Sequence, residues 1–342
     1  MIQRHSDSRR LTRNELNSLV DKAADLIRTA VDYKFILVLL FLKRLNDIRA
    51  RESKQRKPAD EETQKVARKI PENLLWGAIT QDGRTLPGKL ANAMGEIAKL
   101  IPALQGVIDK IDFLEFARNQ ENQRLLTRLI DLFNKYDLGS EKITADILGD
   151  AYEHILLKFA PERAKEGEIY TPRKVIQLIV ELLDPKPGES VYDPCCGSGG
   201  MLIVSYRYVM QKFGKPEAEK LSLYGQERNR EIYAVSAMNL LFHEIKNARL
   251  QSGDTLEYPR FKEDGRLQTF RVVLGNVPWN QDGYDQERLQ NADFPERFKF
   301  GFTPSTSADW AWIEHAIAST HERGRIGLVV DNGCLFRTGQ EK

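Results

Sequence analysis

The 342-residue sequence predicts an α/β fold with an open parallel sheet, preceded by an all-α amino-terminal domain. Three observations support this fold class. Apolar residues recur at helical spacing through the first half, short apolar runs alternate with helical patterns in the second half, and the first of those runs breaks into a glycine-rich loop. Because about 150 residues is typical of one domain, the length also favours two domains.

The amino-terminal half, residues 1–160, is predicted to be a helical domain. The apolar periodicity is interrupted at Pro161–Gly167, so we expect a second domain at 161–342. The apolar run Phe35–Leu42 is far shorter than the ~20 residues that a membrane span needs, and we expect a buried helix face there. The predicted helices are 16–29, 33–50, 90–100, 122–134 and 143–159.

A basic segment lies between Lys43 and Lys69, where ten Lys or Arg face five Asp or Glu, although the whole chain carries a net charge of only +2. Two interpretations stay open. The segment is either a solvated helix and loop or a patch that contacts DNA phosphates, and the second makes binding steeply salt-dependent. Neutralising Arg51, Lys54, Arg56 and Lys57 together would distinguish the two interpretations, because an unchanged salt dependence of DNA binding would exclude the phosphate-contacting patch.

The glycine-rich loop follows a short predicted strand that ends at Asp193-Pro194. It contains Gly197, Ser198, Gly199 and Gly200 and runs into a helical pattern that reaches about Lys212. Such a loop brings backbone N–H groups close to a ligand. It matches neither the dinucleotide fingerprint nor a phosphate loop. The charge of Asp193 favours a ligand with an amino group or a sulfonium, although an ordinary tight turn is the alternative.

Two further predicted strands end in acids. The strand 221–227 ends in Glu227, which could accept both hydroxyls of a ribose, and the strand 248–254 ends in Asp254; a helix is predicted between them at 228–243. A single acid after a strand is usually a helix cap. Three successive strands with an acid at each carboxyl end favour a ligand site, because open α/β sheets bind ligands there.

The apolar run Val272–Gly275 is followed by Asn276, Val277, Pro278 and Trp279, which suit a flipped nucleobase. An exocyclic amine is a poor nucleophile until acceptors bind its N–H groups. Asn276 offers a side-chain carbonyl, the next peptide carbonyl is a second acceptor, and Trp279 can stack an unstacked base. A helix at 310–320 and a strand at 325–330 are predicted to follow.

These segments, in this order and spacing, resemble the adenine-N6 DNA methyltransferases, and among them the modification (M) subunit of type I restriction-modification systems. The resemblance implies a Rossmann-like sheet that binds S-adenosyl-L-methionine, with the methyl group passing directly to adenine. It implies no metal. The residues that the resemblance assigns to the methionine part of the cofactor are Glu168, Ile169, Tyr170, Thr171, Pro172 and Arg173. Those of the cofactor loop are Asp193, Gly197, Ser198, Gly199 and Gly200, while Glu227 is assigned to the ribose and Asp254 lies near the adenine. The catalytic motif is Asn276, Val277, Pro278 and Trp279.

Two departures from the family pattern keep a second hypothesis open. Val277 stands where the family has its first proline, whose ring fixes φ near −65°, and the sequence ends before the strands that complete the family's sheet. An incomplete sheet is expected to expose an apolar edge. The alternative is therefore a catalytically silent or truncated remnant that acts as a DNA-binding or assembly subunit.

Other methyltransferases are also considered. Pro194-Cys195 matches the nucleophile dipeptide of cytosine-C5 enzymes, but it lies in the cofactor loop rather than beside the base pocket. An RNA or protein-glutamine methyltransferase is a closer rival, because its target nitrogen needs similar acceptors.

The resemblance also implies partners and a compartment. The partners are double-stranded DNA, a specificity (S) subunit that reads the sequence and, in the full complex, a restriction (R) subunit. Cys195 and Cys196 are adjacent and Cys334 is solitary, which favours a reducing compartment. The polar segment Met1–Arg10 lacks the apolar stretch of a signal peptide, so we expect a cytoplasmic protein without membrane association.

Overall fold

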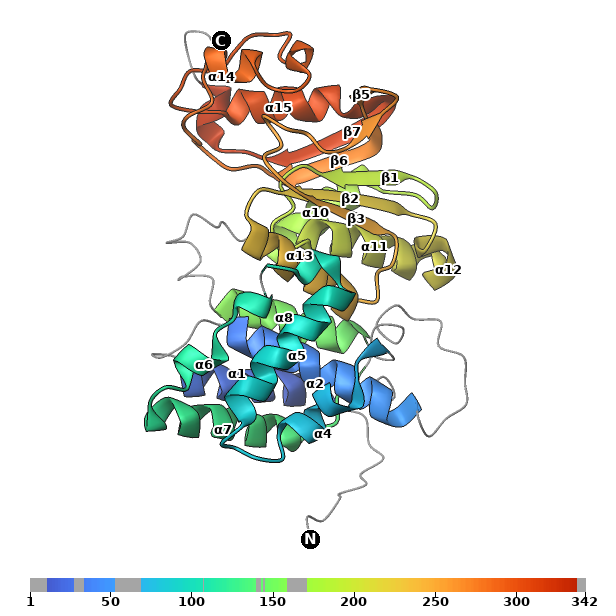
Figure 1. Cartoon of the computed structure of the whole chain (residues 1–342). Coiled ribbons are helices and arrows are strands. Elements are labelled where there is room, and N and C mark those ends of the chain that lie inside the picture. The colour runs from blue at the N-terminus through green and yellow to red at the C-terminus, as the bar shows by residue number, and fades with distance from the viewer. Residues whose placement is uncertain are drawn as a thin grey trace. The chain divides into compact units, whose positions relative to one another are not determined.

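The structure is a computed structural model that describes residues 11–27, 34–52, 69–106, 108–139, 143, 145–158 and 171–336. It divides into two compact units. The first comprises Met1–Glu166 with Leu241–Glu244, and the second comprises Gly167–Leu240 with Ile245–Lys342. The first unit is helical and the second contains the sheet (Figure 1).

The helical unit contains the five long helices that the apolar periodicity predicted. They are α1 (Arg13–Ile27), α2 (Lys34–Glu52), α5 (Leu86–Leu100), α7 (Gln120–Asn134) and α8 (Ala145–Lys158). The predicted ends at residues 29, 33 and 159 lie outside the described residues. Two one-turn helices, α4 (Trp76–Ile79) and α6 (Phe113–Phe116), were not predicted, because four residues are too few for a periodic pattern.

Local signals start these helices. The side chain of Asn119 accepts a hydrogen bond from the N–H of Asn122 at 2.7 Å and caps α7. The run Ile36–Leu42 in α2 is at most 1% exposed, which confirms the predicted buried face. No helix in the described part of the chain combines the length and the apolar character that crossing a membrane requires.

The first residues of the basic segment serve the helical core. Lys43 is 5% exposed, pairs with Asp47 and donates to the carbonyl of Tyr136 at 2.8 Å, while Arg44 is 2% exposed and donates to the carbonyl of Leu138. These two cations therefore cannot contact phosphates in this fold. Residues 53–68, with most of the patch, lie outside the described residues.

The second unit is built on a five-stranded parallel sheet. Its strands are β1 (Ser190–Asp193), β2 (Ser222–Glu227), β3 (Ala248–Ser252), β6 (Phe270–Asn276) and β7 (Thr320–Val329), in the order β3-β2-β1-β6-β7 (Figure 1). A small antiparallel hairpin, β4 (Lys262–Glu263) and β5 (Arg266–Leu267), was not predicted. The chain builds outward from β1 through β2 to β3 and then returns to the other side of β1 with β6. The strand order therefore reverses between β1 and β6.

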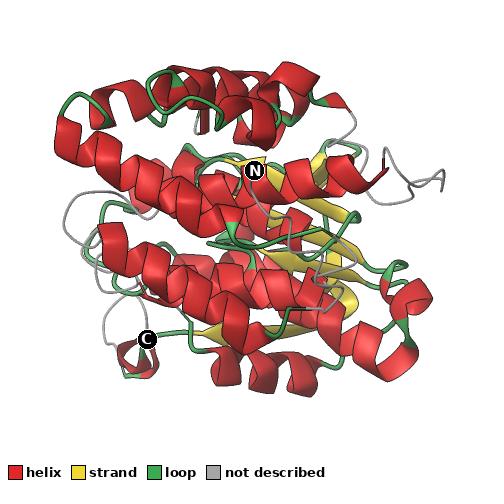
Figure 2. Ribbon diagram, turned by 90° about the horizontal axis from the view of Figure 1, so that it is seen from below, coloured by secondary structure: helices red, strands yellow, loops and turns green. Residues whose placement is uncertain are grey.

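Helices flank the sheet of the second unit (Figures 1 and 2). Alternate residues of each strand face opposite sides of the sheet. Val191 and Leu223 pack with α10 (Arg173–Leu183), α11 (Gly200–Phe213) and Leu240 of α13 (Arg230–Phe242). Their neighbours along the strands, Tyr192 and Tyr224, pack on the opposite side with Ala316 of α15 (Asp309–Ala318). The remaining short helices of this unit are α12 (Lys215–Ala218) and α14 (Gln286–Gln290).

The last strand in the sequence, β7, is longer than predicted. β7 starts at Thr320 rather than at 325, because Thr320 already pairs with Phe270 of β6. The polar residues His321–Gly324 lie where the register then shifts before Arg325 pairs with Val272, at an edge of the described sheet. Polar residues are tolerated on an edge strand, where one side of the ladder faces away from the sheet. Ile326 on this strand is 39% exposed. The expected helix 310–320 is α15, which ends two residues earlier.

Candidate active site at the strand-order reversal

The carboxyl ends of β1 and β6 lie side by side where the strand order reverses. Asp193 is the last residue of β1, and Asn276 is the last residue of β6. The Sγ of Cys195 donates a hydrogen bond to the main-chain carbonyl of Asn276 at 3.3 Å. A Cβ on Gly275 would come within 3.2 Å of Asp193 Oδ1. The fold thus joins the predicted cofactor loop to the predicted catalytic motif, at the place where open α/β sheets bind ligands.

The glycine-rich loop is fixed on its protein side and open at Gly197. Gly199 has φ of 82° and caps α11, and a Cβ there would lie 2.7 Å from Ser236 Oγ. Gly197 has φ of 51°, but a Cβ there would meet nothing within 4 Å. The side-chain amide of Asn239 donates to the carbonyl of Ser198 at 3.0 Å. Gly199 is therefore required for packing, whereas Gly197 borders space that a ligand can use.

Asp193 is buried, with only 2% of its surface exposed. Its Oδ1 accepts a hydrogen bond from the N–H of Cys195 at 3.1 Å. Burial raises the pKa of Asp193 to about 7, and the nearby charge of Glu227 acts in the same direction. A cationic ligand beside this carboxyl would favour its ionised form and lower the pKa again.

Glu227 ends β2 and contacts the glycine loop through one backbone N–H. Its Oε2 accepts from the N–H of Gly197 at 3.0 Å, and its Oε1 accepts from the N–H of Asn229, just after β2, at 2.8 Å. A carboxylate has about four acceptor positions, and hydroxyl groups are suitable donors to it. The bond to Gly197 also brings Glu227 to the open side of the loop.

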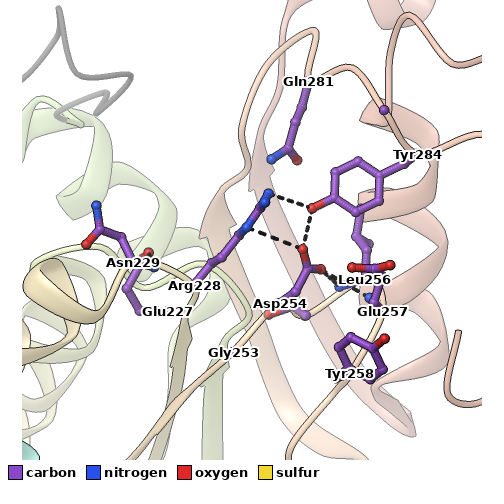
Figure 3. Close-up of polar contacts among 12 residues, drawn as sticks. Glu227, Arg228, Asn229, Gly253, Asp254, Leu256, Glu257, Tyr258, Gln281 and Tyr284 are labelled. Carbon is purple, nitrogen blue, oxygen red and sulfur yellow. Dashed lines mark hydrogen bonds and ion pairs between the residues drawn. The ribbon is translucent and has the colours of Figure 1, made fainter. Parts of the chain in front are cut away.

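Asp254 follows β3 and lies in a polar cluster (Figure 3). Its Oδ1 accepts from the N–H groups of Leu256 and Glu257 at 3.0 and 3.1 Å. Its Oδ2 accepts from the hydroxyl of Tyr284 at 2.5 Å and lies 3.5 Å from Arg228 Nε. Arg228 Nη1 also donates to the Tyr284 hydroxyl at 3.0 Å. Burial and the bond to Asp254 raise the pKa of Tyr284.

The sequence analysis did not assign Arg228 or Tyr284 to the candidate site. Arg228 directly follows Glu227, so its position next to an expected ligand acid was the one available signal. Tyr284 comes eight residues after Asn276, in a loop whose path no local pattern predicts.

A buried arginine supports the loop after Asp254. Arg297 Nη1 donates to the carbonyl of Thr255 at 2.9 Å, and its Nη2 donates to the carbonyl of Leu256. The same guanidinium lies 2.7 Å from His315 Nδ1. Burial lowers the pKa of Arg297 to about 10, and burial together with this arginine holds the pKa of His315 well below its usual range. Neutral His315 can therefore accept a hydrogen bond from Arg297.

The motif 276–279 combines a buried acceptor with an exposed ring. Asn276 Oδ1 is buried and has no hydrogen-bond partner in the structure. Val277 is 1% exposed and packs with Tyr284 and Trp312. Pro278 is half-buried, and Trp279 is 38% exposed. An unpaired buried carbonyl costs about 1–3 kcal/mol, and a ligand donor that reached Asn276 Oδ1 would offset this cost.

The segment predicted to cover the cofactor is described only in part. Pro172 precedes α10, and its carbonyl accepts from the N–H of Val175 at 2.8 Å. Arg173 begins α10, and Thr171 is half-buried. Ile176 Cδ1 lies 3.5 Å from where a Cβ on Gly200 would be, so the first turns of α10 and α11 are adjacent. Glu168, Ile169 and Tyr170 lie outside the described residues.

The cysteine of the loop is unsuited to nucleophilic attack. Burial, followed by the charge of Asp193, raises the pKa of the Cys195 thiol well above its usual range. Since the thiolate is the nucleophilic form, this environment argues against the cytosine-C5 mechanism.

Comparisons with known proteins identify the family to which this fold and sequence belong. The crystal structure of the methyltransferase subunit of a type I restriction-modification system from Streptococcus thermophilus has the same fold, with a TM-score of 0.80 at 23% identity over 96% of this chain and 77% of that chain. Residues 143–342 match the N-6 DNA Methylase family, and residues 16–133 match the HsdM N-terminal domain. The chain belongs to the N-6 DNA methylase family, which confirms the resemblance.

Two curated relatives come from Methanocaldococcus jannaschii. They are the MjaVII and MjaVIII methylase subunits of type I restriction enzymes, each 35% identical over 97% of this chain. The chain spans 59% of the length of each of these relatives.

Proposed function

We propose that this protein is the modification subunit of a type I restriction-modification system and methylates adenine N6 in DNA with S-adenosyl-L-methionine. The observation that carries the proposal is the unpaired, buried carbonyl oxygen of Asn276, at the end of β6 beside the cofactor loop. The family match and the type I methylase relatives support the reaction and its substrate class.

The motif would activate and hold the target base. The Asn276 side chain and the Val277 carbonyl accept hydrogen bonds from the amine, which directs its lone pair away from the ring. These acceptors stabilise the charge that develops on the nitrogen during transfer. The exposed ring of Trp279 offers an apolar surface on which the flipped base stacks. Orientation by these groups would supply much of the rate enhancement.

The residues at the sheet end fit S-adenosyl-L-methionine. The space beside Gly197 gives room for a ligand, Asp193 and Glu227 supply carboxylates, and Asp254 lies at the next strand end. When bound, this cofactor supplies an electrophilic methyl group on a sulfonium. Thr171, Pro172 and Arg173, with Glu168, Ile169 and Tyr170 before them, would cover its methionine part.

The helical unit would contact DNA and a specificity subunit. Its match to the HsdM N-terminal domain supports this assignment. In the proposed complex, the specificity subunit selects the site and a restriction subunit adds nuclease activity. In this proposal, both subunits act on DNA together with this protein in the cytoplasm.

Replacing Asn276 with Ala tests the proposal. The variant loses one fixed acceptor, and we expect methyl transfer to DNA adenine to fall by about 10²–10³-fold. Because the wild-type carbonyl is buried without a partner, the variant should be as stable as wild type or more stable. Asn291→Ala is the matched control, since the side-chain amide of Asn291 donates to the carbonyl of Glu287 in α14.

The assay uses the full chain co-expressed with the specificity subunit, labelled cofactor and DNA. Unchanged transfer by Asn276→Ala would refute the assignment of the motif. The transfer assay separates the silent-remnant alternative, because a remnant would transfer no methyl group, and calorimetry with S-adenosyl-L-methionine shows whether such a remnant has also lost the cofactor pocket.

A further inference from the structure

The main-chain carbonyl of Val329, at the end of β7, accepts two hydrogen bonds from the motif 276–279. The N–H of Val277 donates to it at 3.3 Å, and the indole Nε1 of Trp279 donates to it at 3.4 Å. Both distances are slightly longer than the usual range of about 2.7–3.2 Å. One acceptor on the edge strand thus contacts the backbone and the aromatic ring of the proposed catalytic motif.

The bond from Val277 is one that proline cannot make. Proline has no N–H, and it sets φ through its ring instead. Val277 has the N–H but lacks the ring, so its φ must be fixed by its surroundings. This position is the one at which the chain departs from the motif it resembles.

The peptide unit between Asn276 and Val277 is held at both ends. Its carbonyl accepts the bond from Cys195 Sγ at 3.3 Å, and its N–H donates to Val329. The cofactor loop therefore contacts one side of this planar unit and β7 contacts the other.

Packing supplies the remaining restraint. The Val277 side chain is 1% exposed and lies in the apolar cluster with Tyr284 and Trp312. The peptide plane before Val277 and the direction of its Cα–Cβ bond together determine φ. A fixed φ is the same restraint that a proline ring imposes.

We propose that the Val329 carbonyl is a positioning group that replaces the missing proline ring and orients the Val277 carbonyl and the Trp279 ring toward the base. This inference rests on the proposed function. The indole bond fixes the ring orientation while 38% of the Trp279 surface stays exposed for stacking. Valine at 277 and tryptophan at 279 act as a pair, since each contributes one N–H to the same acceptor.

An amide-to-ester substitution tests the backbone bond directly. Cell-free synthesis of the full chain with α-hydroxyvaline at position 277 replaces the N–H by an oxygen and keeps the side chain. The ester also weakens the carbonyl that accepts from Cys195, so both restraints on this unit are reduced together. The matched control is the same ester at Val273, which pairs with β1 and β7 in the middle of β6.

Methyl transfer is measured with DNA and the specificity subunit, and cofactor binding is measured separately. The proposal predicts that kcat falls roughly 3- to 100-fold for the ester at 277, as expected for a misplaced reacting group, with affinity for S-adenosylhomocysteine unchanged. The ester at 273 lowers stability but leaves kcat within about twofold. Equal kcat values for the two esters would overturn the proposal, since they would indicate a structural ladder bond only.

The indole bond has its own pair of variants. Trp279→Phe keeps an aromatic ring but loses the donor, and we expect kcat to fall about 2- to 10-fold, the value of one hydrogen bond. Trp310→Phe is the control, because the indole of Trp310 donates to the carbonyl of Cys334 at 3.1 Å and not to Val329. A Trp279→Phe variant as active as Trp310→Phe would overturn the role of the indole.

Hydrogen exchange separates this inference from the proposed function. The Val277 amide should exchange slowly in the wild-type chain, because its N–H is bonded and its side chain is buried. Fast exchange would overturn the inference even in an active enzyme. A wild-type complex that transfers no methyl group would refute the proposed function, and the exchange of this amide would still decide whether Val329 holds the peptide unit.

Discussion

Lowering the pH from 8 to 6 should weaken binding of S-adenosyl-L-methionine about tenfold, through Asp193. Burial raises the pKa of this carboxyl to about 7, so it is mostly ionised at pH 8 and mostly protonated at pH 6. The cofactor is cationic, and its charge favours the ionised carboxyl. If binding needs that form, the apparent dissociation constant scales with the inverse of the ionised fraction, which changes about tenfold over this range.

The same group makes folding stability depend on pH in the opposite sense. The native state keeps the Asp193 proton up to about pH 7, whereas the unfolded chain loses it near the ordinary value of about 4. Stability therefore falls as the pH rises from about 4 to about 7. The loss approaches about 4 kcal/mol, since each pKa unit corresponds to about 1.4 kcal/mol.

Calorimetry on wild type and Asp193→Asn at pH 6, 7 and 8 measures the pH dependence of cofactor binding. The amino group of the cofactor also titrates near pH 8, and the Asn variant provides that background. Urea unfolding at the same pH values measures the pH dependence of folding stability, and Asp193→Asn should be more stable than wild type at pH 8. A wild-type affinity with the same pH dependence as that of Asp193→Asn would refute the reasoning.

Three further predictions concern the neighbouring groups. Glu227→Gln should weaken S-adenosylhomocysteine binding at least fivefold in calorimetry, because a neutral amide is a poorer acceptor for ribose hydroxyls and for the N–H groups of Gly197 and Asn229; wild-type affinity would contradict this. Gly199→Ala should lower the free energy of unfolding by more than Gly197→Ala, because only at Gly199 would a Cβ meet a side chain, at 2.7 Å; equal urea midpoints would contradict it. Tyr284→Phe should raise S-adenosylhomocysteine affinity about 2- to 10-fold, because it removes the hydroxyl that donates to Asp254 Oδ2, an acceptor that the cofactor's adenine amine would use. Unchanged or weaker binding would show that the hydroxyl does not compete with the adenine amine for this oxygen.

Local patterns predicted much of the secondary structure. The long helices of the first unit have strong apolar periodicity, and their observed bounds agree with the prediction to within a few residues. β2 ends at Glu227 as expected. The prediction missed the β4-β5 hairpin, although its turn residues Asp264 and Gly265, both with positive φ, are a local hairpin signal. It also shortened β7, because the first half of that strand, His321–Gly324, is polar and has no strong strand pattern.

The candidate site was predictable in its residue types but only partly in its contacts. The sequence placed Asp193 and Asn276 at two strand ends, and the strand order then brought these ends together. Arg228 and Tyr284 were absent from the prediction, because their contacts with Asp254 join three separate segments.

The sequence by itself determined the order of the motifs, and with it the family. Helix and strand signals, glycines and acids at strand ends are local properties of the chain, so they can be recognised before folding. The tertiary structure alone decided that Asp193 is buried, which raises its pKa. It also decided that Val277 is held by Val329, because a hydrogen bond between residues so far apart in sequence depends on the strand order and not on either residue.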